Sequence, residues 1–500
     1  MKNGRKAAIN ILVSTGVQIV TLALGLLLPR IILLNWGSEY NGLINSITTV
    51  MQYLALLEAG IGTSTLQALY RSLGQNDEYQ TSVVIKSSRK YYKKVACVYA
   101  LAVVGVSAIY PLLLKTTIPY WEIFFAIMLQ GCTGVINFAF RAAYQQLLNA
   151  EGKYYVVSLI TLLTTVLTYA AKIISVLIFD SIIVMQIFGV IVMGIQILIY
   201  SVYFRKKYRW IDNSVSPDMA LLKNRKYYLI QQIAGLVFNS TDILVLSVFC
   251  SLQIASVYSV YKMVYAALAT LIGILRYSTN FIQGQAFHSE RQEFAQKYKI
   301  YTSFQVVLGG LLASCSVVLV RGFVRLYTAG VTDVEYMNYP AAVLFSINFM
   351  LDCARGTSLA CANVAGQAPK TSWRYIAEAI INLSASLVLV NIVGMNGVLL
   401  GTLIAGIWRT TDSIVFFNRK VLEKKPTGEL LLVGVVFLIF FIYTLIGYNV
   451  MLPINNYLQF VLWGLLAGGV SIVLFGATFY FANRRVIHMS INKNKKLSGG

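Results

Sequence analysis

The residues with the most distinctive chemistry are charged side chains inside long apolar stretches. Ten are basic: Arg30, Arg71, Arg141, Lys172, Lys262, Arg276, Arg321, Arg325, Arg355 and Arg409. Five are acidic: Glu58, Asp242, Asp352, Glu378 and Asp412. Ten minus five leaves a surplus of +5, and each such charge costs about 2.5–3.5 kcal/mol at a membrane helix centre unless it faces water or a partner. The surplus predicts a bound anion, and arginine suits a phosphate or pyrophosphate because its planar fork donates bidentate hydrogen bonds.

The basic residues differ in how well they fit the role of a ligand. Arg276 has no acidic residue within one helical turn, and Lys262 lies well inside its apolar stretch. Substrate-binding residues are therefore predicted at Arg276, Lys262, Arg141, Arg355 and Arg30. Arg30 lies near a predicted helix end, so it either binds the anion or extends its charged end to the membrane surface.

The acidic residues allow two interpretations. Asp352 and Arg355 are three residues apart, as are Arg409 and Asp412, so these pairs can neutralise each other along a helix. Ion-coupling residues are predicted at Glu58, Asp242 and Asp352. Glu58 and Asp242 either carry a coupling H⁺ or Na⁺ or balance a nearby arginine.

Tyr258, Tyr261 and Tyr265 form a helical stripe around Lys262. Aromatic rings in this pattern either stack on sugar rings or pack between helices, and packing is the commoner use.

Residues for catalysis or for a cofactor do not stand out. The two histidines, His288 and His488, both fall in segments expected outside the membrane, so no histidine-based metal site or triad is predicted at membrane depth. The six cysteines lack metal-ligand spacing, and Gly60-Ile61-Gly62 matches no complete nucleotide-binding motif. Transport work would then draw on an H⁺ or Na⁺ gradient, on the membrane potential or on downhill substrate flow, with no cofactor.

The composition requires a membrane environment for these side chains. Of 500 residues, 57% are hydrophobic and only 12% are charged, about half the charged fraction of a soluble domain. Apolar runs predict an all-α polytopic membrane protein of about fourteen transmembrane helices. Their spans are 8–34, 40–71, 94–115, 119–147, 154–179, 182–204, 227–249, 254–285, 302–328, 339–366, 374–393, 396–418, 430–449 and 457–483.

The basic residues of the connections test this count. They fall almost entirely in the even-numbered connections and at both termini, whereas the odd-numbered connections hold only Lys115. By the positive-inside rule both termini are cytoplasmic. The net charge of +22 is then mainly a topological signal with anionic membrane lipids as its partner, and no nucleic-acid partner is expected.

An internal repeat organises the helices. Arg141, Asn149 and Gly152 recur as Arg355, Asn363 and Gly366, an offset of 214. The same offset aligns 40–43 with 254–257, so helix n pairs with helix n+6. We expect two six-helix lobes related by a pseudo-two-fold axis, plus two C-terminal helices. The predicted divisions are an N-lobe at 1–204, a cytoplasmic linker at 205–226, a C-lobe at 227–420 and a C-terminal region at 421–500.

Three short motifs of this sequence resemble those of a known family. They are Tyr40-Asn41-Gly42-Leu43, Leu56-Leu57-Glu58-Ala59-Gly60-Ile61-Gly62 and the helix end Asn149-x2-Gly152. They are similar to the polysaccharide (O-antigen and capsule) repeat-unit flippases of the multidrug/oligosaccharidyl-lipid/polysaccharide (MOP) exporter superfamily. The resemblance implies a MATE-like fold and a flippase in the bacterial inner membrane, and the short predicted connections, which leave no room for a soluble catalytic domain, indicate that the protein is not an enzyme. The resemblance also implies an undecaprenyl-pyrophosphate-linked oligosaccharide as substrate, moved to the outer leaflet by alternating access, and a polysaccharide polymerase as partner.

Three alternatives stay open. A lipid II flippase also has fourteen helices and cavity arginines. A cation-coupled drug exporter is disfavoured because such exporters typically carry an acidic residue in the first helix, and this chain has none before Glu39. A non-transporting scaffold of a polysaccharide assembly complex is the third.

Overall fold

The structure is a computed structural model of the whole chain, and it describes residues 2–58, 61–75, 77–212, 214–218, 226–289, 291–365, 367–450 and 452–498. The Ala59-Gly60 pair, Gly366 and the 219–225 part of the predicted linker lie outside these residues, as do the side chains of both histidines. Over the described ranges the chain is helical, with 88% helix and no strands. The prediction of an all-α fold is confirmed.

The helices are long and apolar enough to cross a membrane. Among the described residues, eleven segments meet both conditions. One of them holds two predicted spans, because α1 (Lys2–Ala55) breaks at Gly37, where the backbone takes a φ of 78° that favours glycine. Large apolar side chains such as Leu101, Ile178 and Leu438 lie exposed on the helix surfaces. Since a soluble protein rarely exposes such broad apolar area, this is a multi-pass membrane protein.

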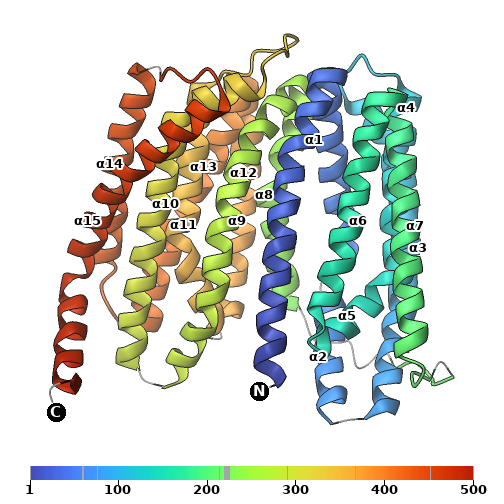
Figure 1. Cartoon of the computed structure of the whole chain (residues 1–500), viewed down its shortest axis with the longest axis horizontal. Coiled ribbons are helices and arrows are strands. Elements are labelled where there is room, and N and C mark those ends of the chain that lie inside the picture. Colours follow the sequence, from blue (N-terminus) through green and yellow to red (C-terminus); the bar gives the residue numbers. More distant parts are fainter. Residues whose placement is uncertain are drawn as a thin grey trace. The chain divides into compact units, whose positions relative to one another are not determined.

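The chain forms two compact units, Met1–Ser256 and Val257–Gly500, each described here by itself. The first unit contains a bundle of long helices, shown in blue to green in Figure 1. Its elements after α1 are η1 (Leu56–Glu58), α2 (Ile61–Gly74), α3 (Glu78–Leu113), α4 (Tyr120–Ile136), η2 (Asn137–Arg141), α5 (Ala142–Ala150), α6 (Tyr154–Ile174), η3 (Ser175–Phe179), α7 (Ile182–Lys207) and α8 (Lys226–Phe249).

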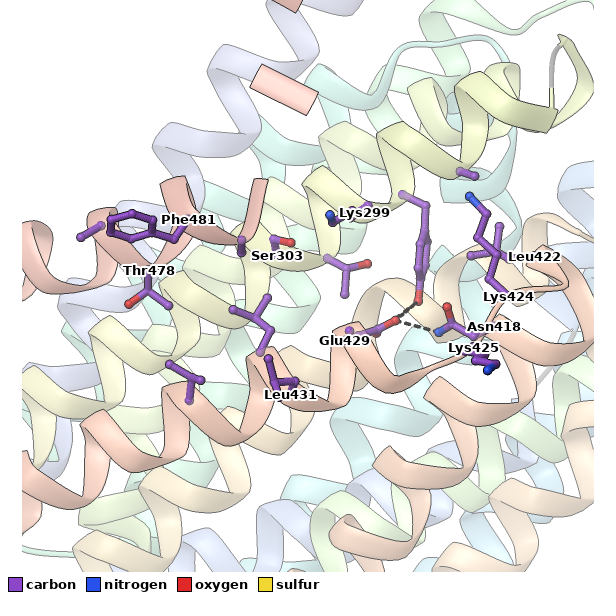
Figure 2. Close-up of a pocket in the computed structure, with 18 residues that line it drawn as sticks. Lys299, Ser303, Asn418, Leu422, Lys424, Lys425, Glu429, Leu431, Thr478 and Phe481 are labelled. Atoms are coloured by element: carbon purple, nitrogen blue, oxygen red, sulfur yellow. Dashed lines mark hydrogen bonds between the residues drawn. The ribbon is translucent and has the colours of Figure 1, made fainter. Parts of the chain in front are cut away.

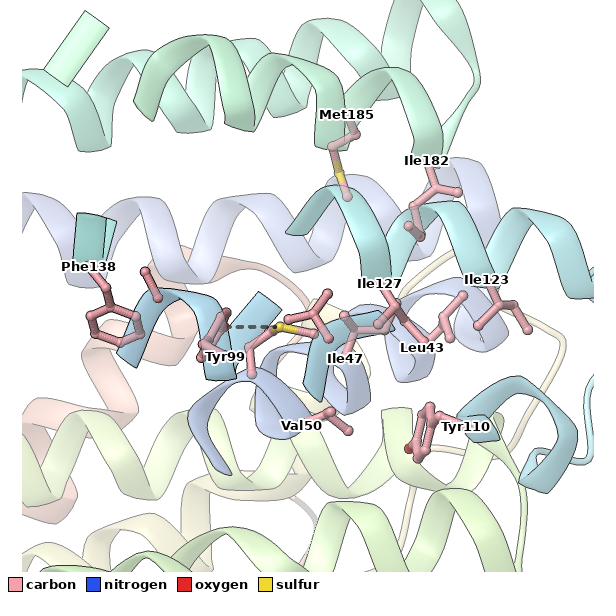
Figure 3. Close-up of a cluster of buried hydrophobic side chains, with 14 of the residues drawn as sticks. Leu43, Ile47, Val50, Tyr99, Tyr110, Ile123, Ile127, Phe138, Ile182 and Met185 are labelled. Atoms are coloured by element: carbon pink, nitrogen blue, oxygen red, sulfur yellow. Dashed lines mark hydrogen bonds between the residues drawn. The ribbon is translucent and has the colours of Figure 1, made fainter. Parts of the chain in front are cut away.

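The core of the first unit is built around the contact between α3 and α4. Leu43, Ile47 and Ile127 are fully buried there (Figure 3). Gly134 of α4 lies against the Tyr99 ring, and an added Cβ would come within 2.5 Å of the Tyr99 hydroxyl. The Tyr99 ring meets Phe138 edge-on, with centroids 5.2 Å apart. This packing fixes the end of α4 and the η2 turn after it.

The second unit holds the remaining helices, shown in yellow-green to red in Figure 1. They are α9 (Leu252–Ser289, which begins within the first unit), α10 (Arg291–Tyr327), α11 (Tyr339–Val364), α12 (Ala368–Val393), α13 (Met395–Phe417), η5 (Asn418–Leu422), α14 (Thr427–Asn449) and α15 (Tyr457–Ser498). Helices α11, α12 and α13 pack closely, with α13 against both of the others.

The two units end matching helices in the same way. At the end of α5, the amides of Glu151 and Lys153 donate to the carbonyls of Leu147 and Leu148. At the end of α11, the amides of Ala365 and Gln367 donate to the carbonyls of Cys361 and Ala362. Each of these four residues at the end of α11 lies 214 positions after its counterpart at the end of α5, which is the offset expected from the sequence. The predicted divisions at 1–204, 205–226, 227–420 and 421–500 stay a prediction.

Candidate functional site

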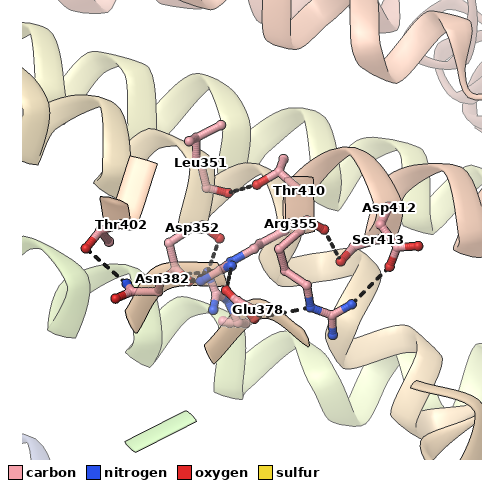
Figure 4. A network of polar contacts seen from close by, with 11 residues as sticks. Leu351, Asp352, Arg355, Glu378, Asn382, Thr402, Thr410, Asp412 and Ser413 are labelled. Atoms are coloured by element: carbon pink, nitrogen blue, oxygen red, sulfur yellow. Dashed lines mark hydrogen bonds and ion pairs between the residues drawn. The ribbon is translucent and has the colours of Figure 1, made fainter. Parts of the chain in front are cut away.

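The second unit contains a chain of alternating charges on four helices. Figure 4 shows the part of it around Asp352, Arg355 and Glu378. Arg276 of α9 pairs with Asp352 of α11 at 3.5 Å, and Asp352 also pairs with Arg355 at 3.3 Å. Arg355 also forms an ion pair with Glu378 of α12. Glu378 in turn pairs with Arg409 of α13 at 3.3 Å, so one carboxylate bridges two arginines.

The far end of this ion-pair chain lies between α12 and α13. Arg409 pairs with Asp412 at 3.2 Å, and Asp412 pairs with Arg374 at 3.0 Å. The Arg409 guanidinium also stacks on the Tyr375 ring, 4.4 Å from its centroid. We call the four arginines and three carboxylates of this chain the C-unit network: Arg276, Asp352, Arg355, Arg374, Glu378, Arg409 and Asp412.

The centre of the C-unit network is closed to solvent. The side chains of Arg409, Glu378 and Arg355 are 1%, 5% and 9% exposed, whereas Asp352 at one end is 47% exposed. Buried charges are costly to remove from water, so each must keep its partner. Four arginines against three carboxylates leave a net charge of only +1, so the C-unit network itself carries little of the predicted cationic surplus.

Arg276 is tied into the network by close packing. Its guanidinium lies against the backbone of Gly356, where an added Cβ would overlap Nη2. Its Nη2 also donates to the Asp352 carbonyl at 3.3 Å. Arg276 lacks an acidic neighbour along its own helix, but α11 supplies one. Its role as a substrate ligand stays a prediction.

The first unit places Arg141 in a different environment. Arg141 ends η2, a π-turn inserted between α4 and α5. Such a turn adds a residue to the helix and rotates the next helical segment by roughly 100°, and π-turns are frequent at functional sites. Arg141 Nη1 donates to Gln196 Oε1 of α7 at 2.6 Å, and Gln196 Nε2 donates to Thr164 of α6 at 2.8 Å. A neutral amide therefore holds the guanidinium.

Arg141 keeps hydrogen-bonding capacity that its described surroundings do not use. Its Nε is buried and has no hydrogen-bond partner among the described residues. The Tyr200 hydroxyl, which lies within electrostatic range of Arg141, is in the same condition. In the described part of the chain Arg141 makes no ion pair. Arg409 Nη2 of the C-unit network is likewise buried without a hydrogen-bond partner among the described residues. Arg141 therefore differs from the network arginines by its neutral amide partner rather than by the unused donor.

Glu58 completes this first-unit site. It lies in η1, where the Tyr92 hydroxyl of α3 donates to its Oε1 at 2.9 Å. The carboxylate attracts Arg141 electrostatically without an ion pair between the two in the described chain. We call Glu58, Tyr92, Arg141, Gln196 and Tyr200 the N-unit site. Gln196 and Tyr200 were not among the predicted residues, since neutral polar side chains on an apolar helix give no charge signal.

The end of the first-unit bundle is held by a second polar cluster next to α7. The Tyr208 hydroxyl donates to Glu151 at 2.5 Å, and Lys153 pairs with the same carboxylate. Burial and then the hydrogen bond to Glu151 raise the pKa of Tyr208, so the phenol stays a neutral donor. This cluster ties the α5–α6 turn to the end of α7 and so supports the helix that carries Gln196.

The other predicted residues are spread over both units. Arg30 lies half-buried on α1, and Asp242 is buried on α8. Lys262 lies on α9, with its ammonium 5.7 Å from the Tyr258 ring centroid. The tyrosine stripe packs between helices, because Tyr261 and Tyr265 both stack on Phe345 of α11. Packing is therefore the interpretation that the structure supports for the stripe.

Two further arginines serve helix ends in the second unit. Arg321 donates to the Tyr448 carbonyl at 2.9 Å near the end of α14, and Arg325 donates to Asn455 at 2.6 Å. A cation near a helix C-terminus complements its dipole. These contacts account for both residues without a ligand.

No family model matches the sequence, and no curated protein matches it either. Solved structures do match. An inward-facing multidrug resistance MATE family transporter of the MOP superfamily aligns with a TM-score of 0.68 at 14% identity, over 82% of this chain and 98% of that one. The lipid II flippase MurJ, inward closed, aligns with a TM-score of 0.64 at 13% identity, over 95% and 100%. An outward-facing multidrug resistance MATE family transporter aligns with a TM-score of 0.57 at 15% identity, over 84% of this chain and 96% of that one.

These alignments define the class of fold. The chain has the fold of the MOP superfamily transporters, as the sequence resemblance implied. At these identities the likeness concerns the fold alone.

Proposed function

We propose that the protein is a flippase that moves an undecaprenyl-pyrophosphate-linked oligosaccharide across the bacterial inner membrane by alternating access, for capsule, O-antigen or exopolysaccharide synthesis. The observation that carries the proposal is the N-unit site. Arg141 is half-buried, held by a neutral amide and left with a buried Nε that has no hydrogen-bond partner in the described structure. A pyrophosphate offers the acceptor oxygens that such a guanidinium lacks.

The extent of the structural matches supports a lipid-linked substrate. The inward-facing MATE transporter uses 98% of its own chain but covers only 82% of this one, which leaves 18% unmatched. MurJ covers 95%. The additional length agrees better with a lipid flippase than with a drug exporter. It also makes translocation of lipid II the second candidate function.

The C-unit network supports a division of roles. Its arginines already have carboxylate partners, so a substrate anion would have to displace an existing ion pair there. The Nε of Arg141 has no such partner to displace in the described structure. We therefore place the first contact with the pyrophosphate at Arg141, with Arg276, Lys262, Arg355 and Arg30 as further candidate ligands. Glu58 is the nearest candidate for a coupling H⁺ or Na⁺, and Asp242 and Asp352 are the others.

Reconstituted transport tests the proposal. Liposomes with the purified protein would receive a fluorescent polyprenyl-pyrophosphate oligosaccharide, lipid II or a polyprenyl-free cationic dye. We expect movement of the first lipid, and a loss of roughly tenfold to a hundredfold in Arg141→Gln, as expected for a charge-assisted hydrogen bond. Lys93→Gln, which removes an exposed charge on α3, is the matched control. Movement of lipid II alone would favour the second candidate, and movement of the dye alone would refute both.

A further inference from the structure

A cavity of about 660 Å³ lies in the second unit, and its lining contains none of the residues of the C-unit network. It is bounded by α10, the η5 turn and the loop after it, α14 and α15 (Figure 2). Helix α10 packs along both α14 and α15, whereas α14 and α15 share few contacts with each other, among them the hydrogen bond from Ser471 to Tyr443. The cavity therefore lies between two membrane helices, α14 and α15, and α10 closes its base. We call it the α14–α15 seam. Its volume is in the range of ligand-binding sites.

The walls of this seam are divided into an apolar part and a basic part. Leu431, Leu432 and Val435 of α14 and Phe481 of α15 line the apolar part, in which Figure 2 labels Leu431 and Phe481. Lys299 of α10 and Lys424 and Lys425 of the loop before α14 line the basic part, and all three are exposed. A long apolar groove with cations at one end matches the chemistry of a lipid with an anionic headgroup.

The one acidic residue of the lining is turned to internal partners. Glu429 accepts hydrogen bonds from Asn418 at 2.8 Å, from Tyr298 at 3.0 Å and from Ser358 at 3.4 Å. Three lysines against one carboxylate leave the lining with a charge of +2. In the described structure none of the three lysines makes an ion pair, so their charge is available to a ligand.

We propose that this seam binds an anionic phospholipid of the bilayer, with its phosphate at Lys299, Lys424 and Lys425 and one acyl chain between α14 and α15. The sequence indicated anionic lipids as general partners of the basic loops, and the seam supplies a specific site for one. The lipid would fill the gap between two helices that share few contacts and so hold them in place. The site is separate from the N-unit site and does not depend on what the protein transports.

Native mass spectrometry of the full-length protein in detergent tests this site. Phosphatidylglycerol would be titrated against phosphatidylcholine with the same chains. The variant Lys299→Gln/Lys424→Gln/Lys425→Gln removes the basic end. The control Lys90→Gln/Lys93→Gln/Lys94→Gln removes three exposed lysines of α3. We expect phosphatidylglycerol binding to weaken on the order of a hundredfold in the first variant, because each lysine near an anionic headgroup contributes about fivefold, and to persist in the control.

A second variant tests the apolar part without touching the charges. Val435→Trp narrows the groove and should weaken binding of the long-chain lipid. Equal phosphatidylglycerol binding by the triple variant and its control would overturn the proposal. So would displacement by millimolar inorganic phosphate with no effect of Val435→Trp, since the site would then be a phosphate site only. Preferential displacement by polyprenyl phosphate would also overturn it and assign the seam to the transported lipid.

Discussion

Arg141 and Arg355 occupy equivalent positions of the repeat, yet their surroundings differ. Arg355 lies in an uninterrupted α-helix and is enclosed by two carboxylates, Asp352 and Glu378. Arg141 ends a π-turn and is held by the amide of Gln196. The same residue type therefore serves two purposes. Arg355 joins α11 to α12 within the C-unit network, and we propose that Arg141 keeps a donor for an anion.

This difference shows that the role of a charged residue inside the membrane depends on its contact partners, and not only on its residue type or depth. A guanidinium with carboxylate partners stabilises the fold, and removing one of those partners leaves a buried charge. Replacing a guanidinium that is held by neutral groups should lower the free energy of unfolding less, because no buried counter-charge is left behind. Such a guanidinium can instead provide an anion site. Substitutions in the two units can separate these roles.

The largest effect is expected at the centre of the C-unit network. Glu378→Gln removes the carboxylate that Arg355 and Arg409 share. We expect the free energy of unfolding to fall by about 3–5 kcal/mol, because two buried guanidinium groups lose their counter-charge. Thermal unfolding of the purified variant measures this loss. Glu335→Gln removes the same charge from an exposed loop and should change stability by less than about 0.5 kcal/mol.

A smaller loss is expected where Arg276 packs on α11. In Gly356→Ala the new methyl group would overlap the Arg276 guanidinium and push it from Asp352. Overpacking of this kind costs about 1–3 kcal/mol. In Gly189→Ala of α7, where the added Cβ meets open space, stability should rise by about 0.5–1 kcal/mol. Equal stability of the two variants would argue against the close packing of Arg276.

The smallest effect on stability is expected in the N-unit site. Tyr92→Phe removes the hydrogen bond to Glu58 and should cost about 0.5–1.5 kcal/mol. If Glu58 carries the coupling ion, the ion dependence of transport should change while the protein stays folded. Transport with an unchanged response to H⁺ and Na⁺ gradients would remove Glu58 from that role.

The sequence was sufficient for the fold because a bilayer restricts a chain to long apolar helices. It also indicated the offset of 214 and the two pairs, Asp352 with Arg355 and Arg409 with Asp412, which lie one turn apart on a helix. The bridge through Glu378 was not predictable, because its partners lie 23 and 31 positions away and meet only when α11, α12 and α13 pack.

The cationic surplus is a count of charges and does not say which arginines have carboxylate partners. Three of the five acidic residues gather around arginines of the second unit, and this clustering depends on helix packing. The π-turn at Arg141 was equally hidden, since no residue type marks such a turn. Gln196 and Tyr200 carry no charge, and they stand out only once the structure places them beside Arg141.

The most direct test of the two roles compares Arg141→Gln with Arg355→Gln in the same membranes, with thermal unfolding and translocation of the lipid-linked oligosaccharide measured on each. We predict that Arg141→Gln lowers the free energy of unfolding by about 1.5 kcal/mol, the loss of one charge-assisted hydrogen bond, but reduces translocation roughly tenfold to a hundredfold. Arg355→Gln should lose about 3–5 kcal/mol of stability. Normal translocation by Arg141→Gln, or unfolding of both variants to the same extent, would contradict the account.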